Sequence, residues 1–380
     1  MTEASSLIEN LRTDCMYYLG DRPCRPHVEA DHRCTCIHFQ PTQRRGIIIK
    51  LGAAGDVLRS TPLLRALDPV KTGTKILWVT HSPELLPIDA CEAVHPSAAT
   101  LARIAQGTWD FCWNLDKDPE ACAIAASTKA AEYRGYTLRD DVPYPVDKAA
   151  WHKFATGIDN PYSRDNRQSY VEEIFDITGL RFRREEYWLR DTTSTAKETA
   201  VRLLPRDFAI GLNIGAGKRW PSRIWPVEYW IELIELLKAR GLQPVVLGGP
   251  EEVKMSAQLV DATGCSASGV QPLETFYAMI ERCQCIVSAV TMAMHLAIGA
   301  RVPLVLLNNI FNRYEFELYD RGEIVEPPAL CDCYYSPVCR TGRKCINEIS
   351  PETVFGAVLR SLKSARRAGD SEHVGARRAS

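Results

Sequence analysis

Residues 46–67 combine a buried-strand signal, two closely spaced glycines and a helix signal. Residues 47–49 form an apolar, β-branched run without alternation, as expected of a strand buried on both faces. Gly52 and Gly55 follow, and glycine permits tight turns that other residues disfavour. From Val57 onward, leucines recur at helical spacing. The segment therefore predicts a strand, a glycine loop and a helix, with backbone N–H groups at the ligand-binding edge of a parallel sheet.

One carboxylate, Asp56, stands at the predicted start of that helix. Aspartate is a preferred N-cap, a role that contributes about 1 kcal/mol to helix stability. Alternatively, the carboxylate faces a ligand at the carboxyl edge of the sheet. The spacing alone leaves both interpretations open. Because the glycines match neither G-x-G-x-x-G nor the P-loop, the motif does not support a dinucleotide or Walker-type site.

The rest of the chain repeats the strand–helix alternation twice. Residues 46–190 and 205–349 each predict an α/β lobe, and the polar segments 191–197 and 204–207 mark the linker. Residues 132–166 lack clear periodicity, so we expect a loop there.

The two ends of the chain fall outside these lobes. Residues 1–45 form a Cys- and His-rich extension, and residues 350–364 predict a last helix. The small, charged tail 365–380 is expected to be disordered.

Several of these motifs carry a family resemblance. The segment 50–62, KLGAAGDVLRSTP, resembles the opening of glycosyltransferase family nine, the ADP-heptose:lipopolysaccharide heptosyltransferases. Further similarity lies at residues 215–230, 247–252 and 291–297, so the resemblance extends from about residue 46 to 362.

The resemblance implies a fold, a reaction and a base. The fold is GT-B, an α/β architecture of two Rossmann-like doubly wound lobes facing a cleft, with the last helix crossing back to the first lobe. The reaction is inverting transfer of a sugar, usually heptose from ADP-heptose, to a hydroxyl of a cell-envelope glycan such as lipopolysaccharide core. Asp56 matches the proposed general base.

Loops of the second lobe are expected to bind the donor. A nucleotide-sugar leaving group carries two phosphates, whose charge the protein must stabilise. The family's Lys matches Arg223 by position, although Lys218 also precedes a Trp-Pro pair. The expected donor-side residues are Gly215, Gly217, Lys218, Arg223, Gly248, Gly249, Glu251, Val270, Gln271, Thr291, Met292, Ala293 and His295.

Two departures from the family pattern leave the donor sugar open. Val290 replaces an Asp and Met292 replaces a Gly, and His295 fits a buried structural role as well as a ligand contact. On the acceptor side we expect Gly52, Gly55, Arg134 and Arg164, the alternative for the two arginines being ordinary lobe surface.

Eight of the fourteen cysteines fall into two clusters. Four thiolates bind Zn²⁺ tetrahedrally, so each cluster predicts a structural zinc site, with free thiols as the alternative. Catalysis itself is expected to need no cofactor. The first set is Cys15, Cys24, Cys34 and Cys36, and the second is Cys331, Cys333, Cys339 and Cys345.

Net charge and hydropathy bear on which partners the protein can bind. A formal net charge of −1 gives no general argument for nucleic acid, and no apolar run approaches a membrane span. We therefore expect a cytoplasmic enzyme with at most peripheral membrane contact, a nucleotide-sugar donor and a glycan or lipid-linked acceptor. Two alternatives stay open: a GT-B sugar-nucleotide epimerase, and a non-catalytic scaffold that binds a nucleotide-sugar or glycan.

Overall fold

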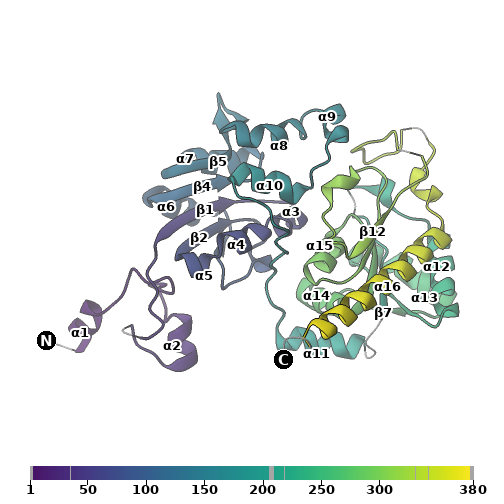
Figure 1. Ribbon diagram of the computed structural model, residues 1–380, viewed down its shortest axis with the longest axis horizontal. Helices are drawn as coiled ribbons and strands as arrows, with labels where there is room; N and C mark the ends of the chain where they lie inside the picture. The colour runs from purple at the N-terminus through teal and green to yellow at the C-terminus, as the bar shows by residue number, and fades with distance from the viewer. Residues whose placement is uncertain are drawn as a thin grey trace. The chain divides into compact units, whose positions relative to one another are not determined.

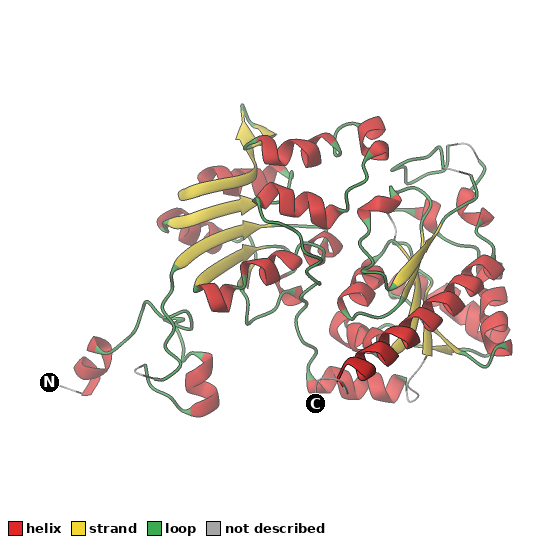
Figure 2. Ribbon diagram, viewed as in Figure 1, coloured by secondary structure: helices red, strands yellow, loops and turns green. Residues whose placement is uncertain are grey.

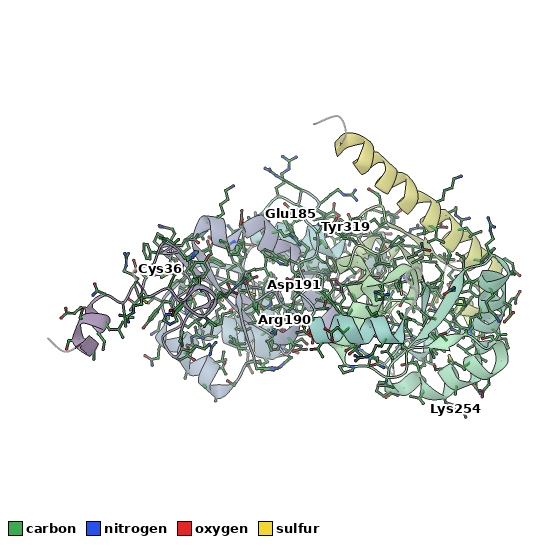
Figure 3. The ribbon with its side chains drawn as sticks, turned by 90° about the horizontal axis from the view of Figure 1, so that it is seen from below. Cys36, Glu185, Arg190, Asp191, Lys254 and Tyr319 are labelled. Carbon is green, nitrogen blue, oxygen red and sulfur yellow. The ribbon has the colours of Figure 1, made fainter. Side chains whose placement is uncertain are left out.

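The computed structural model describes residues 3–34, 36–204, 209–217, 219–329, 331–340 and 342–376. The chain divides into two compact units. The first comprises Met1–Ala155 and Glu172–Arg190, and the second comprises Thr156–Val171 and Asp191–Ser380. The last border lies between Arg190 and Asp191, both labelled in Figure 3.

The first unit is built on a six-stranded sheet with strand order β3-β2-β1-β4-β5-β6. Strands β1 to β5 run parallel, and only β6 pairs antiparallel, with β5. Helices alternate with the strands along the chain, as Figures 1 and 2 show. The strands are β1 (Arg44–Ile49), β2 (Thr74–Val79), β3 (Glu92–Val94), β4 (Trp109–Asn114), β5 (Ala130–Arg139) and β6 (Val142–Pro145).

The helices from Glu3 to Thr178 are short. They are α1 (Glu3–Glu9), α2 (Arg25–Ala30), α3 (Ala54–Leu58), α4 (Pro62–Leu67), α5 (Pro69–Thr72), α6 (Ala98–Gln106), α7 (Pro119–Ser127), α8 (Trp151–Ala155), α9 (Asn160–Asp165) and α10 (Tyr170–Thr178), with 3₁₀ turns η1 (Pro83–Leu85) and η2 (Lys148–Ala150). Of these, α9 belongs to the second unit and the start of α10 lies at the border between the units.

The last residues of β1 are apolar because they lie at the centre of the first sheet. Ile47 and Ile49 are fully buried in a cluster with Leu77 and Cys112 on the neighbouring strands. At Gly46, an added Cβ would overlap the ring of Phe111. A strand covered on both faces must be apolar without alternation, so the predicted buried strand is confirmed.

The N-terminal extension has no core of its own. None of the described residues from Ala4 to Arg45 is buried. The extension makes polar contacts with the rest of the first unit. Nζ of Lys75 donates to the backbone oxygen of Tyr18 at 2.7 Å, and Arg25 forms an ion pair with Asp89. A cavity of about 750 Å³ remains between the extension and strands β2 and β3.

The second unit contains an all-parallel sheet with strand order β12-β11-β10-β7-β8-β9. Its strands are β7 (Ala209–Asn213), β8 (Gln243–Leu247), β9 (Ser266–Ala267), β10 (Cys283–Ala289), β11 (Leu304–Leu307) and β12 (Gly322–Val325). Its helices are α11 (Ser194–Leu203), α12 (Val227–Ala239), α13 (Val253–Thr263), α14 (Leu273–Glu281), α15 (Met292–Gly299) and α16 (Pro351–Ala376), and its 3₁₀ turns are η3 (Pro221–Arg223), η4 (Pro250–Glu252), η5 (Arg313–Glu315) and η6 (Cys345–Glu348).

Two tryptophans anchor helix α12 to the core of the second unit. The rings of Trp225 and Trp230 meet edge to face with centroids 4.8 Å apart, and the indole N–H of Trp225 donates to the oxygen of Ile349 at 2.9 Å. Helix α12 begins after Pro226 and ends before Gly241, whose φ of +80° suits the residue that follows a helix.

Three predicted boundaries differ from the structure. Residues 132–166 contain strands and helices, because β5 pairs along its length with β4 and then turns into β6. Residues 156–171, predicted in the first lobe, cluster with the second unit, where Asn312 holds the backbone of Ser163 and Asn166 through 2.8 Å bonds. Helix α11 overlaps the predicted linker but packs on α14 in the second unit. Linker residues 205–207 lie outside the described residues.

The last helix is longer than predicted. Helix α16 packs against α12, β10, β11 and β12 and continues to Ala376, so the expected disorder from residue 365 is not found up to that point. Ala and Arg favour helix and allow the extension. Residues 377–380 lie outside the described residues, and the predicted return of α16 to the first lobe stays a prediction. In the described part of the chain, no helix is long and apolar enough to cross a membrane.

Candidate active site

Asp56 lies in the first turn of α3, immediately after β1 and its loop. The N-cap of this helix is Ala53, so Asp56 is not the cap. One carboxylate oxygen lies 2.8 Å from Nη2 of Arg59 and the other 3.9 Å from Nζ of Lys50. The Asp56 side chain is 32% exposed. A carboxylate beside two cations and partly open to solvent has the chemistry to accept a proton from a bound hydroxyl.

Lys50 connects this carboxylate to a second one. Its Nζ lies 3.1 Å from Oδ2 of Asp116, which follows β4, and the same oxygen accepts the backbone N–H of Gly52 at 3.3 Å. Lys50 is only 5% exposed. Neither Gly52 nor Gly55 has a positive φ, so the turn between β1 and α3 does not depend on a left-handed glycine conformation. A Cβ added at Gly52 would have no other atom within 4 Å.

The two predicted acceptor-side arginines belong to different units. Arg134, on β5 of the first unit, is paired with Glu132 at 3.2 Å and Asp147 at 3.1 Å. Arg164, on α9 of the second unit, stacks its guanidinium 4.8 Å from the ring centroid of Tyr334. Their acceptor role stays a prediction, and the pairing of Arg134 also suits a structural one.

The glycines of the second unit make room for a carboxylate that the sequence analysis missed. A Cβ at Gly215 would lie 2.5 Å from Oε1 of Glu252, and a Cβ at Gly248 would lie 2.9 Å from the Glu252 Cβ. Oε2 of Glu252 accepts the N–H of Gly249 at 2.9 Å. The side chain of Glu252 therefore lies against the loops at the ends of β7 and β8. The donor role of the neighbouring Glu251 stays a prediction. The only sequence signal was Glu252's place at the end of a glycine loop.

Arg223 is buried at the same edge. Its Nη2 donates to the oxygen of Ala216 at 2.7 Å, and its Nη1 donates to the oxygen of Val290. Among the described residues, its Nε has no hydrogen-bond partner and no carboxylate pairs with the guanidinium. Burial lowers the pKa of Arg223 to about 10, so the side chain is still charged at neutral pH. It thus links the loops after β7 and β10, and its guanidinium is a buried positive charge that pairs with no carboxylate among the described residues.

Helix α15 begins beside this tether. Its first residue, Met292, comes two positions after Val290, whose carbonyl Arg223 binds. The hydroxyl of Thr291 does not cap the helix but bonds Asn213 at 3.1 Å and Ser288 at 2.9 Å. The side chain of Thr291 therefore leaves the first turn of α15 uncapped, and the N–H groups of a helix's first turn can bind an anion.

The remaining predicted donor residues are more scattered. Ala293 and His295 are buried within α15, in line with a structural role for the histidine. Val270 is exposed, and Nε2 of Gln271 bonds the oxygen of Ser268 at 2.8 Å. Gly217 adopts φ +69°, with open space around it. Lys218 lies outside the described residues.

The cysteine clusters do not form a metal centre in the described residues. No group of three or more His, Cys, Asp or Glu side chains in the described ranges is arranged to hold a metal ion. The four cysteines of the extension, including Cys36 in Figure 3, are half-buried. In the cysteine loop, residues 331–345, each sulfur accepts an N–H bond: Cys331 from Cys333, Cys333 from Arg340, Cys339 from Lys344, and Cys345 from Asn309, at 3.0–3.5 Å.

The donor-side loops of the second unit, from Gly215 to His295, fall inside a family match. Residues 168–313 match the model of glycosyltransferase family 9 (heptosyltransferase). The family resemblance is confirmed. With it, the prediction that this chain is a glycosyltransferase enzyme is confirmed. The matched segment spans most of the second-unit sheet and its donor-side loops, but it does not include Asp56.

Several solved glycosyltransferase structures have the same fold as this chain. A family 9 glycosyltransferase of Veillonella parvula superposes with a TM-score of 0.66 at 19% identity, covering 85% of this chain and 98% of its own. The ADP-heptose lipopolysaccharide heptosyltransferase II of E. coli gives 0.60 at 15%, covering 85% and 99%. The iron-containing dodecameric glycosyltransferase TibC of E. coli gives 0.53 at 13%, covering 85% and 80%. The GT-B fold class is therefore confirmed. No curated protein matches this glycosyltransferase by sequence.

Proposed function

We propose that the protein is an inverting glycosyltransferase that transfers heptose from ADP-heptose to a hydroxyl of a cell-envelope glycan. The match to the heptosyltransferase family model supports the sugar, and the likeness to an ADP-heptose-dependent enzyme of E. coli supports the donor. The free state of all fourteen cysteines suits a reducing cytoplasm, which is where we place the reaction.

The observation that carries this proposal is the buried charge of Arg223, which no carboxylate among the described residues neutralises. Burying a guanidinium without a carboxylate is costly, and an anionic ligand would offset that cost. The charge lies beside the first turn of α15, whose N-cap residue Thr291 makes no capping bond, and helix N-termini attract phosphate. Both features would stabilise the diphosphate as it leaves the sugar. The carboxylate of Glu252, held against Gly249, is suited to accept bonds from ribose hydroxyls.

Asp56 would act as the general base. It would take the proton of the acceptor hydroxyl while that oxygen attacks the anomeric carbon from the face opposite the diphosphate, which inverts the configuration. Arg59 and Lys50 keep Asp56 ionised and oriented, since an adjacent cation favours the charged form of a carboxyl group.

Thermal-shift screening of the full chain against ADP-, GDP- and UDP-sugars tests the donor. We expect ADP-heptose to raise the melting temperature most and ADP to follow. Product analysis with an envelope glycan acceptor then distinguishes the remaining functions. Transfer with inversion supports the proposal, release of free sugar with UDP would identify an epimerase, and donor binding without turnover would identify a scaffold.

We also propose that the cysteine loop holds a structural metal ion. The sulfurs are not arranged around a common point in the structure, but all four accept N–H donors, as metal-bound thiolates commonly do. Such a set suits a thiolate-preferring ion such as Zn²⁺ or Fe²⁺. We propose a second such site formed by Cys15, Cys24, Cys34 and Cys36. Among the described positions of the extension no residue is buried, and a segment without a core needs a metal ion or another cross-link to fold.

Elemental analysis of protein purified without added metal tests both sites. Cys333→Ser should remove about one metal equivalent, whereas Cys265→Ser, which changes a cysteine outside both clusters, should remove none. Less than half an equivalent in the wild-type protein, with the clustered thiols open to titration, would rule out both sites.

A further inference from the structure

Lys117 is a half-buried cation that the proposed chemistry does not use. It lies three residues after the end of β4, at the carboxyl edge of the first sheet. Its Nζ donates to the backbone oxygen of Lys153 at 3.1 Å and lies 6.0 Å from the ring centroid of Tyr136. A primary ammonium has three N–H donors, so one bond to a carbonyl leaves capacity for a further acceptor.

The nearby carboxylates are already bound to other cations. Asp116 pairs with Lys50 at 3.1 Å. Glu173, on α10, is 0% exposed and pairs with Lys153 at 2.6 Å, with Nε2 of His152 a further 3.6 Å contact. No carboxylate lies within ion-pair distance of Lys117 in the portion of the chain that is described.

Burial is the main reason that the pKa of Lys117 is lowered to about 8. The charges of Lys153 and Lys50 contribute to this shift, and those of Glu173 and Asp116 oppose it. The fold holds an ammonium where neither solvent nor a carboxylate fully stabilises it, and that is the environment in which an anion binds strongly. Lys117 is also next in sequence to Asp116, which Lys50 links to Asp56.

We propose that Lys117 binds an anionic group of the acceptor, a carboxylate or a phosphate, and so selects acidic glycans. The proposal rests on the function given above, because it takes the carboxyl edge of the first sheet, with Asp56, as the acceptor side. The ammonium would donate a charge-assisted hydrogen bond to the anion while its carbonyl bond to Lys153 keeps it in place.

The test measures anion binding in the first unit with the donor site filled. The full chain is ¹³C-methylated on its lysines, saturated with ADP, and titrated with glucose 6-phosphate, glucuronate or glucose. The Lys117 signal is assigned by its loss in Lys117→Gln, and exposed Lys129 is the internal control. We expect the two acidic sugars to move the Lys117 signal and raise its apparent pKa, while glucose and the Lys129 signal show no change.

Calorimetry with the variants completes the experiment. Lys117→Gln should bind the preferred acidic sugar about tenfold more weakly, the effect of losing one charge-assisted hydrogen bond, and Lys129→Gln should bind it like wild type. A larger response to glucose 6-phosphate would identify a phosphate site, and a larger one to glucuronate a carboxylate site. Equal binding of glucose and both acids, or an unshifted Lys117 signal, would overturn the proposal. ADP binding is measured on the same samples; its absence would count against the proposed donor and would leave the Lys117 result standing.

Discussion

The Nζ atom of Lys50 lies 3.1 Å from a carboxylate oxygen of Asp116 and 3.9 Å from one of Asp56. Lys50 follows Ile47, Ile48 and Ile49, which are fully buried, so it is the first polar residue after the buried part of β1. Its ammonium lies between the candidate base and the 15% exposed carboxylate that follows the neighbouring parallel strand β4. Removing it would take from Asp116 the cation with which it pairs.

Lys50→Met should destabilise the first unit by about 2–4 kcal/mol, because loss of one partner leaves the Asp116 charge partly buried and uncompensated. Denaturant unfolding of the variant measures this cost. In the double variant Lys50→Met/Asp116→Leu, much of the loss should be recovered, since both charges are then gone. Equal stability of Lys50→Met and wild type would show that the pair contributes nothing to folding.

Asp56→Asn should keep the fold, because Ala53 and not Asp56 caps α3. Turnover should fall about 10²-fold or more, since an amide cannot accept the acceptor proton. Binding of ADP should be unchanged, because the donor residues lie in the second unit. Steady-state transfer rates and ADP calorimetry on the same preparation separate these effects. Near wild-type transfer by the variant would place the base elsewhere.

Arg223→Gln should weaken ADP binding by about 1.5–3 kcal/mol, the range for a hydrogen bond to a charged group. Glutamine retains a donor for one of the two backbone carbonyls, so the loop tether is partly preserved while the charge is lost. Arg240→Gln, which removes an exposed arginine after α12, is the matched control and should bind ADP normally. Unchanged ADP affinity in Arg223→Gln would show that this charge does not meet the diphosphate.

Lys117 also predicts a pH dependence of stability. Its pKa is about 8 in the folded protein and 10.5 for an ordinary lysine, so between these values the unfolded chain holds a proton that the folded chain has lost. The free energy of unfolding should therefore rise with pH over that interval, relative to Lys117→Met. Below pH 8 the cost of the buried charge is fully present. Unfolding curves of both proteins from pH 7 to 10 measure the difference, and a constant gap would contradict the lowered pKa.

The segments that the sequence predicted correctly were those with strong local signals. Residues 47–49 read as a buried strand because every residue is apolar and β-branched, and β1 is buried there. Pro226 and Gly241, which flank helix α12, are likewise strong local boundary residues. By contrast, β5 was missed because polar and apolar residues do not alternate regularly along it, so that pairing with β4 and β6, rather than its own pattern, makes it a strand.

The sequence by itself determined two α/β lobes, the carboxylate that follows the first strand, and the loops with cationic residues in the second lobe. These depend on local patterns of apolar residues, glycines and charges. Only the tertiary structure decided which groups the charged side chains contact. Lys50 meets Asp116 across 66 residues, Arg223 meets Val290 across 67, and Lys117 meets no carboxylate among the described residues. Strand pairing and loop packing set those distances, and both are properties of the folded chain rather than of any segment.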